Sequence, residues 1–147
     1  MLNSDTLEII FQSALETQKK RKDFNLPFLA IKDHILGKKY TLSLVFANKK
    51  TVTDLNKKYR DKDYTPNILS FPYSKQNGEI FIHLPTAKKQ APDFEMDFDT
   101  YLVFLFIHGC LHLKGMPHSS TMEELERKIL QKMYSNKKTK NENTRKS

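Results

Sequence analysis

The segment from Asp97 to Gly115, with the sequence DFDTYLVFLFIHGCLHLKG, restricts the possible folds more than any other part of the chain. It is apolar on all sides between residues 101 and 107 and runs for about four helical turns, a length that favours a helix over a buried strand. Asp97, Asp99 and Thr100 are suitable N-terminal caps, and Gly115 is a natural helix stop. Because a helix that is hydrophobic all round must be covered all round, we expect it at the centre of the domain.

Three further helices are predicted from apolar residues at helical spacing. The first covers residues 4–22, where Asp5 and Glu8 resemble a capping box. The second covers residues 51–60 and the third residues 121–133. The residues predicted to face the core are Leu7, Ile10, Phe11, Ala14 and Leu15 in the first helix, Val52, Leu55 and Tyr59 in the second, and Met122, Leu125, Ile129 and Met133 in the third.

The remaining regular segments have the patterns of strands. Residues 40–47, YTLSLVFA, alternate in polarity, and residues 67–73 and 78–84 are rich in strand-forming residues on either side of the polar turn SKQN. The last two segments are predicted to form a hairpin. Strands that alternate with helices in a chain of 147 residues indicate one compact α+β domain, without internal repeats or a domain-scale linker.

The net charge of +8 is concentrated at the C-terminal end. Residues 132–147 contain six basic residues and one acidic residue, and they are predicted to form a basic, disordered tail after a domain of residues 1–131. Basic tails attract polyanions, so nucleic acid is a favoured partner. The N-terminus has no signal-peptide pattern, the longest apolar run is too short for a membrane span, and a single cysteine excludes an internal disulfide. We therefore expect a cytoplasmic protein with no membrane partner.

Three of the five histidines lie within eleven residues, in HGCLHLKGMPH. On a helix, His108 and His112 project from the same face one turn apart, and a turn at Gly115 allows His118 to return toward that face. Three neutral imidazoles suit Zn2+ and leave a fourth position open for water, as in catalytic sites. We therefore predict one metal ion per chain, bound by these three histidines. Zinc is preferred by geometry and availability, although three imidazoles also accept nickel, copper or iron.

The spacing of these histidines is that of the metzincin zinc proteases, with one informative difference. Gly109 stands where the metzincins have the glutamate that serves as general base. A peptidase or deacylase is therefore disfavoured. Cys110 lies two residues from each flanking histidine and is expected to point away from the metal. His34 and His83 have no partners at ligand spacing and are expected to be packing or surface residues.

Three blocks of this sequence resemble the YbeY endoribonucleases, a family involved in ribosomal RNA maturation. The family motif H-G-x-L-H-L-x-G-Y-D-H is similar to HGCLHLKGMPH at residues 108–118. A second motif, L-N-x-x-Y-R-x-K-D-x-x-[DN]-V-L-S-F-P, is similar to LNKKYRDKDYTPNILSFP at residues 55–72, and a third, G-D-I, is similar to GEI at residues 78–80. The blocks occur in family order, and the resemblance extends over about residues 40–129.

The resemblance implies a small mixed β-sheet packed against helices, a three-histidine zinc site on the buried central helix, and cleavage of single-stranded RNA. It also implies catalytic roles for Arg60 and His108. A guanidinium can hold phosphate oxygens in a bidentate grip, and bound zinc can polarise the scissile phosphate. By the same resemblance, Asn67 is a candidate contact to a metal ligand or to substrate. The basic residues that are candidate contacts to the RNA backbone are Lys57, Lys58, Arg60 and Lys62.

The chain departs from the family pattern beside the third histidine, where Met116 and Pro117 replace the usual tyrosine and aspartate. A proline can neither orient a metal ligand nor accept a proton. The general base therefore stays unassigned, and the acidic candidates by sequence are Glu79, Glu123 and Glu124.

We therefore predict a zinc-dependent, single-strand-specific endoribonuclease that acts on ribosomal RNA precursors, at the 3′ end of the small-subunit RNA. The expected partners are RNA, the small ribosomal subunit and its assembly proteins. The alternative is a non-catalytic, zinc-stabilised assembly factor that binds RNA or the ribosome, and the loss of the aspartate at Pro117 favours it.

Overall fold

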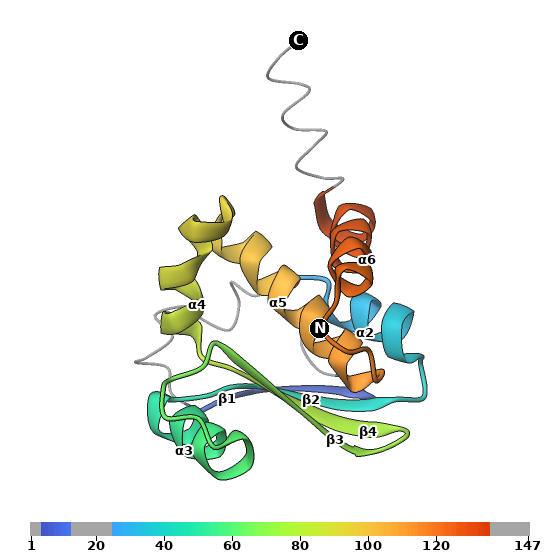
Figure 1. Cartoon of the computed structure of the whole chain (residues 1–147). Helices are drawn as coiled ribbons and strands as arrows, with labels where there is room; N and C mark the ends of the chain where they lie inside the picture. The colour runs from blue at the N-terminus through green and yellow to red at the C-terminus, as the bar shows by residue number, and fades with distance from the viewer. Residues whose placement is uncertain (1–3, 13–24, 136–147) are drawn as a thin grey trace.

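A four-stranded mixed sheet with helices on both faces forms the part of the chain that the structure describes (Figure 1). The computed structural model describes residues 4–12 and 25–135. The elements in chain order are β1 (Leu7–Phe11), α2 (Phe28–Leu36), β2 (Thr41–Phe46), α3 (Lys49–Arg60), β3 (Ile68–Ser74), β4 (Asn77–Ile82), α4 (Leu84–Gln90), the 3-10 helix η2 (Ala91–Phe94), α5 (Phe98–Leu113), α6 (Ser120–Leu130) and the π-helical turn η3 (Gln131–Ser135). The predicted α+β fold with a mixed sheet is confirmed.

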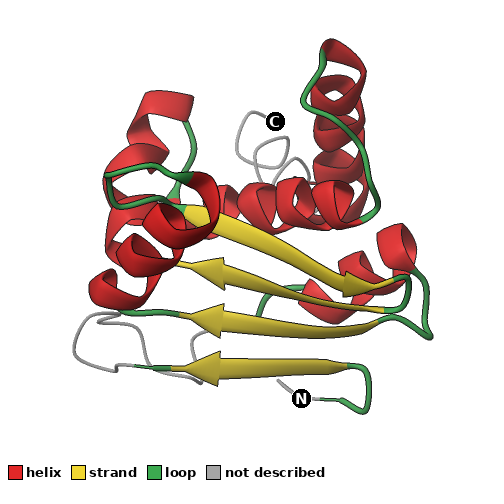
Figure 2. Cartoon of the chain, turned by 60° about the horizontal axis from the view of Figure 1, so that its bottom comes forward, coloured by secondary structure: helices red, strands yellow, loops and turns green. Residues whose placement is uncertain are grey.

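The sheet has the strand order β1-β2-β4-β3. β1, β2 and β4 run parallel, whereas β3 runs antiparallel to β4 and forms the predicted hairpin with it (Figure 2). On one face, α2, α5 and α6 enclose the main hydrophobic core. On the other face, α3 covers a smaller cluster formed by Val45, Ala47, Val52 and Leu69. The hairpin thus lies under α5, the helix that carries the histidines.

The N-terminal segment is a strand, so the predicted first helix is wrong over the residues that the structure describes. Leu7 and Ile9 are buried while Glu8 and Ile10 are exposed, which is the two-residue alternation of a strand. The apolar residues here satisfy both the helical and the strand period, and the pairing of all five residues of β1 with β2 decides between them. Residues 13–22 of the predicted helix lie outside the described residues.

Helix α5 is the central element, as predicted, and ten of its 16 residues are buried. The side chain of Asp97 caps the helix by accepting a hydrogen bond of 2.8 Å from the backbone N–H three residues on. At the other end, Gly115 has a φ of +101°, and the N–H groups of Gly115 and Met116 donate to the carbonyls of His112 and Leu111. These two bonds form the Schellman arrangement, which ends the helix and turns the chain directly after the second histidine.

Helices α3 and α6 also lie where the sequence predicts them, with one difference. The side chain of Asn48 caps α3 and that of Ser119 caps α6. Tyr59, predicted to face the core, is 59% exposed. Its ring lies edge-on to that of Phe71, at a centroid distance of 5.4 Å, so it stands at the rim of the smaller cluster rather than inside it.

The sequence patterns do not predict helices α2 and α4. α2 makes the crossover that the parallel pairing of β1 with β2 requires. Lys32 in this helix is fully buried, and its Nζ donates to the carbonyl oxygens of Gly37, Lys38 and Tyr40 and to Oγ1 of Thr6. Because this charged residue lies on the buried side, it interrupts the apolar stripe from which the helix could have been predicted.

No helix within the described residues is long and apolar enough to span a membrane. Residues 131–135 prolong α6 as η3. The remainder of the predicted basic tail, residues 136–147, lies outside the part of the chain that the structure describes.

Candidate active site

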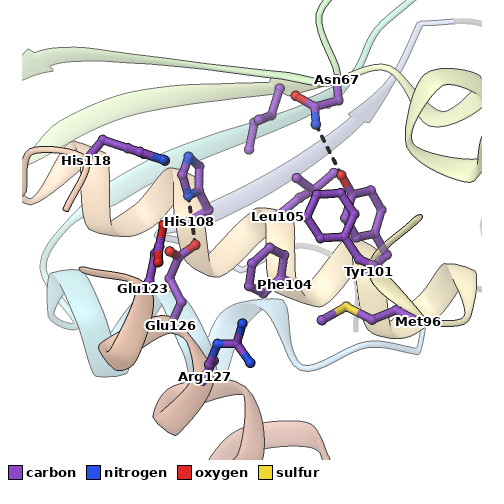
Figure 3. A pocket seen from close by; sticks show the side chains of 12 residues that line it. Asn67, Met96, Tyr101, Phe104, Leu105, His108, His118, Glu123, Glu126 and Arg127 are labelled. Atoms are coloured by element: carbon purple, nitrogen blue, oxygen red, sulfur yellow. Dashed lines mark hydrogen bonds and ion pairs between the residues drawn. The ribbon is translucent and has the colours of Figure 1, made fainter. Parts of the chain in front are cut away.

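The three histidines of the sequence motif lie together at the C-terminal end of α5. His108 and His112 belong to α5, and His118 lies in the loop before α6. One nitrogen of each ring lies within 4.8 Å of the others, and the Nε2 atoms of His108 and His112 are 3.0 Å apart. The ring centroids of His108 and His118 are 5.3 Å apart, and their side chains point toward each other (Figure 3). The turn at Gly115 therefore returns the third histidine, as predicted.

Each helical histidine has a hydrogen-bond acceptor at its second ring nitrogen. Nδ1 of His108 lies 2.7 Å from Oε2 of Glu126, and Nδ1 of His112 lies 3.2 Å from the carbonyl oxygen of Met116. Both acceptors place the proton on Nδ1, so that the unprotonated Nε2 of the neutral ring is available to a metal. Because Met116 belongs to the Schellman turn, the helix stop both returns His118 and orients His112.

This donor set fits a metal ion. Two nitrogens that share one tetrahedral zinc ion lie about 3.3 Å apart. The Nε2 atoms of His108 and His112 are 3.0 Å apart, and a ring nitrogen of His118 lies within 4.8 Å of the other two ligand nitrogens. Burial, followed by the neighbouring His108, lowers the pKa of His112 and favours the neutral imidazole that metal binding needs. The three histidine nitrogens would fill three of the four positions that zinc usually offers and would leave one for water or substrate.

The packing of α5 on the hairpin explains why residue 109 is glycine. A Cβ atom on Gly109 would lie 2.9 Å from Cδ1 of Ile68, 3.0 Å from Cδ1 of Ile80 and 3.0 Å from Oγ of Ser70. The hydroxyl of Ser70 donates to the carbonyl of Gly109 at 3.3 Å, which fixes this close approach. A glutamate at this position would have to push these three side chains aside, in agreement with the sequence argument against a peptidase.

Two pockets meet at the histidines. One, of about 390 Å³, is called the aromatic pocket, and the other, of about 810 Å³, is called the arginine pocket. His108, His118, Asn67 and Ile68 line both. The aromatic pocket (Figure 3) is completed by Phe94, Met96, Tyr101, Phe104, Leu105, Glu123, Glu126 and Arg127. The arginine pocket is completed by Tyr59, Arg60, Tyr64, Leu69, Ser70, Phe71 and His112.

Arg60 lines the same pocket as all three histidines, although it lies 48 positions before the first of them in the sequence. Its Nη1 donates to Oδ1 of the buried Asn56 at 3.2 Å, and Nδ2 of Asn56 donates to the carbonyl of Tyr64 at 3.0 Å. The guanidinium is thereby held at one nitrogen and keeps its other donors for the pocket. The other predicted RNA contacts are exposed and line neither pocket: Lys57, Lys58 and Lys62.

A carboxylate that the sequence analysis missed contacts the first histidine. Glu126 is only 2% exposed and reaches His108 from α6 (Figure 3). It lies four residues after Met122 and three before Ile129, on the stripe of α6 that is buried. An acidic residue within an apolar stripe is the signal that could have identified it, because a buried carboxylate needs a hydrogen-bonding partner.

The three acidic candidates from the sequence have different surroundings. Glu123 lines the aromatic pocket together with His108 and His118, whereas Glu124 is exposed and lines neither pocket. Glu79 accepts a 2.6 Å hydrogen bond from the hydroxyl of Tyr73 on the hairpin. Burial and this hydrogen bond raise the pKa of Tyr73 to about 12. Glu123 is therefore the candidate that the structure places beside the histidines.

Of the remaining residues considered in the sequence analysis, one lines the pockets and three lie outside the histidine group. Asn67 lines both pockets, and its Nδ2 donates to Oε1 of Gln90 at 2.9 Å. Cys110 is fully buried in the core, and burial raises the pKa of its thiol. His83 is buried with Nδ1 2.7 Å from a threonine hydroxyl, and His34 is exposed. None of these three belongs to the histidine group, as expected.

Fold and site together define a class of protein. It is an α+β domain whose central helix, with the loop that follows, carries three histidines able to hold a metal ion between two open pockets. The solution structure of TM1509 from Thermotoga maritima has the same fold, with a TM-score of 0.61 at 20% identity over 91% of this chain and 93% of that one.

Sequence comparison identifies the family. The family model described as Endoribonuclease YbeY matches residues 4–136. The Endoribonuclease YbeY of Neorickettsia sennetsu is 35% identical over 108 residues, which cover 66% of this chain and 76% of that protein. The protein of the same name from Aster yellows witches'-broom phytoplasma is 35% identical over 120 residues, which cover 72% and 79%. The chain belongs to the YbeY endoribonuclease family and is thus a nuclease, a hydrolase in enzymatic class.

Proposed function

We propose that this protein is a zinc-dependent endoribonuclease that cuts single-stranded RNA during maturation of the 3′ end of small-subunit ribosomal RNA. One observation carries the proposal: three histidine nitrogens suited to a metal lie in the same pocket as the guanidinium of Arg60. A metal site and a fixed positive charge in one open pocket are the two elements that phosphodiester cleavage needs.

The metal ligands in this proposal are His108, His112 and His118, which hold one zinc ion per chain. Zinc supplies Lewis acidity and lowers the pKa of a coordinated water. Glu126 positions His108 by accepting a hydrogen bond from its Nδ1–H, and the carbonyl of Met116 does the same for His112.

Arg60 is the proposed phosphate anchor. Its hydrogen bond from Nη1 to Asn56 leaves the donors on Nε and Nη2 to form paired bonds to phosphate oxygens. Lys57 and Lys58 on α3, with Lys62 just beyond it, extend the positive charge away from the pocket and attract the flanking RNA backbone.

Glu123 is the proposed proton acceptor for the attacking water. It lines the aromatic pocket beside His108 and His118, and as an exposed carboxylate it can exchange its proton with solvent. Glu126 lines the same pocket, but its 2.7 Å hydrogen bond commits it to His108. In this proposal Glu123 takes the role of the aspartate that the family usually has at the position of Pro117.

The proposed setting is the cytoplasm, with ribosomal RNA precursors, the small ribosomal subunit and its assembly proteins as partners. We assign the endoribonuclease domain to residues 1–131 and the role of a charged accessory segment to residues 132–147. The six basic residues of that segment would add to the attraction for RNA.

Cleavage of a 3′-extended fragment of small-subunit ribosomal RNA by the zinc-loaded protein tests the proposal. We expect cutting by the wild-type protein, none by His108→Ala, and neither cutting nor stoichiometric zinc in His112→Ala. His34→Ala is the matched control, because that histidine is exposed and outside the group. Stoichiometric metal in His112→Ala would contradict the ligand assignment.

A non-catalytic, zinc-stabilised factor for ribosome assembly is the second candidate. Pro117, which stands where the family usually has an aspartate, favours it. For this candidate the same experiment gives a different result: the zinc-loaded protein binds the RNA fragment and leaves it intact, both alone and with assembling small subunits.

A further inference from the structure

We propose that the aromatic pocket holds one unpaired nucleobase of the RNA, next to the bond that is cut; this inference rests on the proposed function. His108 and His118 line the aromatic pocket as well as the arginine pocket. A strand whose phosphate is held between Arg60 and the histidines therefore continues directly into the aromatic pocket. The neighbouring base is the part of the strand that reaches it.

Phe94 provides the surface on which the base stacks. Phe94 is 51% exposed, and its ring lies on the buried ring of Tyr101, with centroids 5.0 Å apart and planes inclined by 27°. Phe104 continues the layer, 6.2 Å from Tyr101 at an angle of 20°. The inner face of Phe94 is thus supported while part of the ring stays open. Every base can stack on such an exposed ring, whatever its sequence.

The backbone holds Phe94 in this exposed position. Phe94 ends η2, and the next residue, Glu95, has a φ of 56° and a ψ of 36°, a left-handed conformation that is unfavourable for residues other than glycine. The N–H groups of Glu95 and Met96 donate to the carbonyls of Pro92 and Ala91, which closes the turn. The closed turn thus presents a large apolar ring at the pocket that His108 and His118 also line, and a ligand in this pocket would cover it.

The size and polar groups of the pocket also suit a base. A volume of about 390 Å³ lies at the lower end of the range of small-molecule sites. Asn67 offers an amide whose orientation is set by Gln90 and by Tyr101, at 2.9 and 3.4 Å, and Arg127 adds a positive charge for the next phosphate. A base in a duplex is paired and stacked on both sides and cannot enter, so the pocket would select single strands.

The test combines a protein variant with an RNA that lacks one base. A short single-stranded RNA that the zinc-loaded wild-type protein cuts at one mapped bond is prepared with an abasic nucleotide at each position in turn. We expect one position beside the cut to lower kcat/KM by about 5- to 150-fold, the range of one lost base–aromatic stack. Phe94→Ala should lower kcat/KM on intact RNA by a similar factor and show no further loss on that abasic RNA.

Two further variants make the result specific. Phe94→Tyr keeps the ring and should cut like the wild-type protein, and Tyr73→Ala removes an exposed aromatic residue that lines neither pocket and should have no effect. The base site would be overturned if Phe94→Ala cut intact RNA with the kcat/KM of the wild-type protein. It would also be overturned if the abasic nucleotide lowered kcat/KM of Phe94→Ala by the same factor as that of the wild-type protein. Either result would leave the proposed function standing. If the wild-type protein cut no single-stranded RNA, whether or not it bound it, the proposed function would be overturned, and this inference with it.

Discussion

Replacing Glu126 with alanine tests how the site holds its first histidine. The carboxylate is 2% exposed and lies 2.7 Å from Nδ1 of His108. Loss of such a partner behind a metal-bound histidine costs about 10- to 100-fold in metal affinity. We therefore expect the zinc Kd of Glu126→Ala to rise by that factor. Glu126→Gln should remain closer to wild type, because its amide oxygen can still accept a hydrogen bond from Nδ1–H of His108.

The same loss can be measured as protein stability. A metal that binds only the folded state adds about 2.7 kcal/mol to the free energy of unfolding when its free concentration is 100 times Kd. At that concentration, a variant with a Kd raised by 10- to 100-fold gains only about 1.4 to 0.4 kcal/mol. The metal-dependent part of the unfolding free energy should therefore fall by about 1.3 to 2.3 kcal/mol in Glu126→Ala.

Zinc competition with a chelating dye gives Kd, and urea unfolding with and without zinc gives the stability difference. Glu124→Ala is the matched control, because Glu124 lies on the same helix but is exposed and lines neither pocket. If Glu126→Ala bound zinc as tightly as the wild-type protein, the reasoning would be refuted, and the 2.7 Å contact would be a packing feature without influence on the metal site.

The other predictions concern the close packing of α5, the proton acceptor, the buried thiol and one tyrosine. Gly109→Ala should lower the free energy of unfolding by about 1 to 3 kcal/mol, the usual cost of overpacking, because its Cβ would lie 2.9 to 3.0 Å from three side-chain atoms; a wild-type urea midpoint would contradict this. Glu123→Gln should lower kcat by about 100-fold or more with zinc binding unchanged, whereas Glu124→Gln should cut RNA like the wild-type protein. The thiol of Cys110 should not react with a disulfide reagent until the protein is unfolded, because it is fully buried and its pKa is raised; rapid labelling of the native protein would disprove this. The pKa of Tyr73 is raised from 10.0 to about 12 in the folded protein, so its contribution to stability should be present below pH 10 and be lost as the pH rises toward 12; Tyr73→Phe should not show this loss in alkaline unfolding curves.

Local chemistry explains the parts of the site that could be predicted from sequence. The four-residue spacing of His108 and His112 places both on one face of any helix. Gly115 follows that helix at the position where a positive φ closes the Schellman turn, so the return of His118 also depends on neighbouring residues alone. The β3–β4 hairpin is local in the same sense, since its strands adjoin one polar turn.

The errors occur where distant segments decide the outcome. Residues 7–11 satisfy both a helical and a strand pattern, and only their pairing with β2, more than 30 residues further on, makes them a strand. Tyr59 has the spacing of a buried residue on α3, but the helix covers a cluster too small to enclose it. From its residue type Lys32 would be expected at the surface, but its four hydrogen bonds to two other segments allow it to be buried.

The sequence by itself therefore determined the central helix, its end and the three histidines, because these depend on side chains within one or two helical turns of each other. Only the tertiary structure decided what surrounds them. Glu126 meets His108 because α6 packs on α5, and Arg60 reaches the histidines because the β3–β4 hairpin, which begins shortly after α3, packs against α5. These contacts depend on how whole helices and strands pack against one another, and the spacing of residues along the chain does not predict that packing.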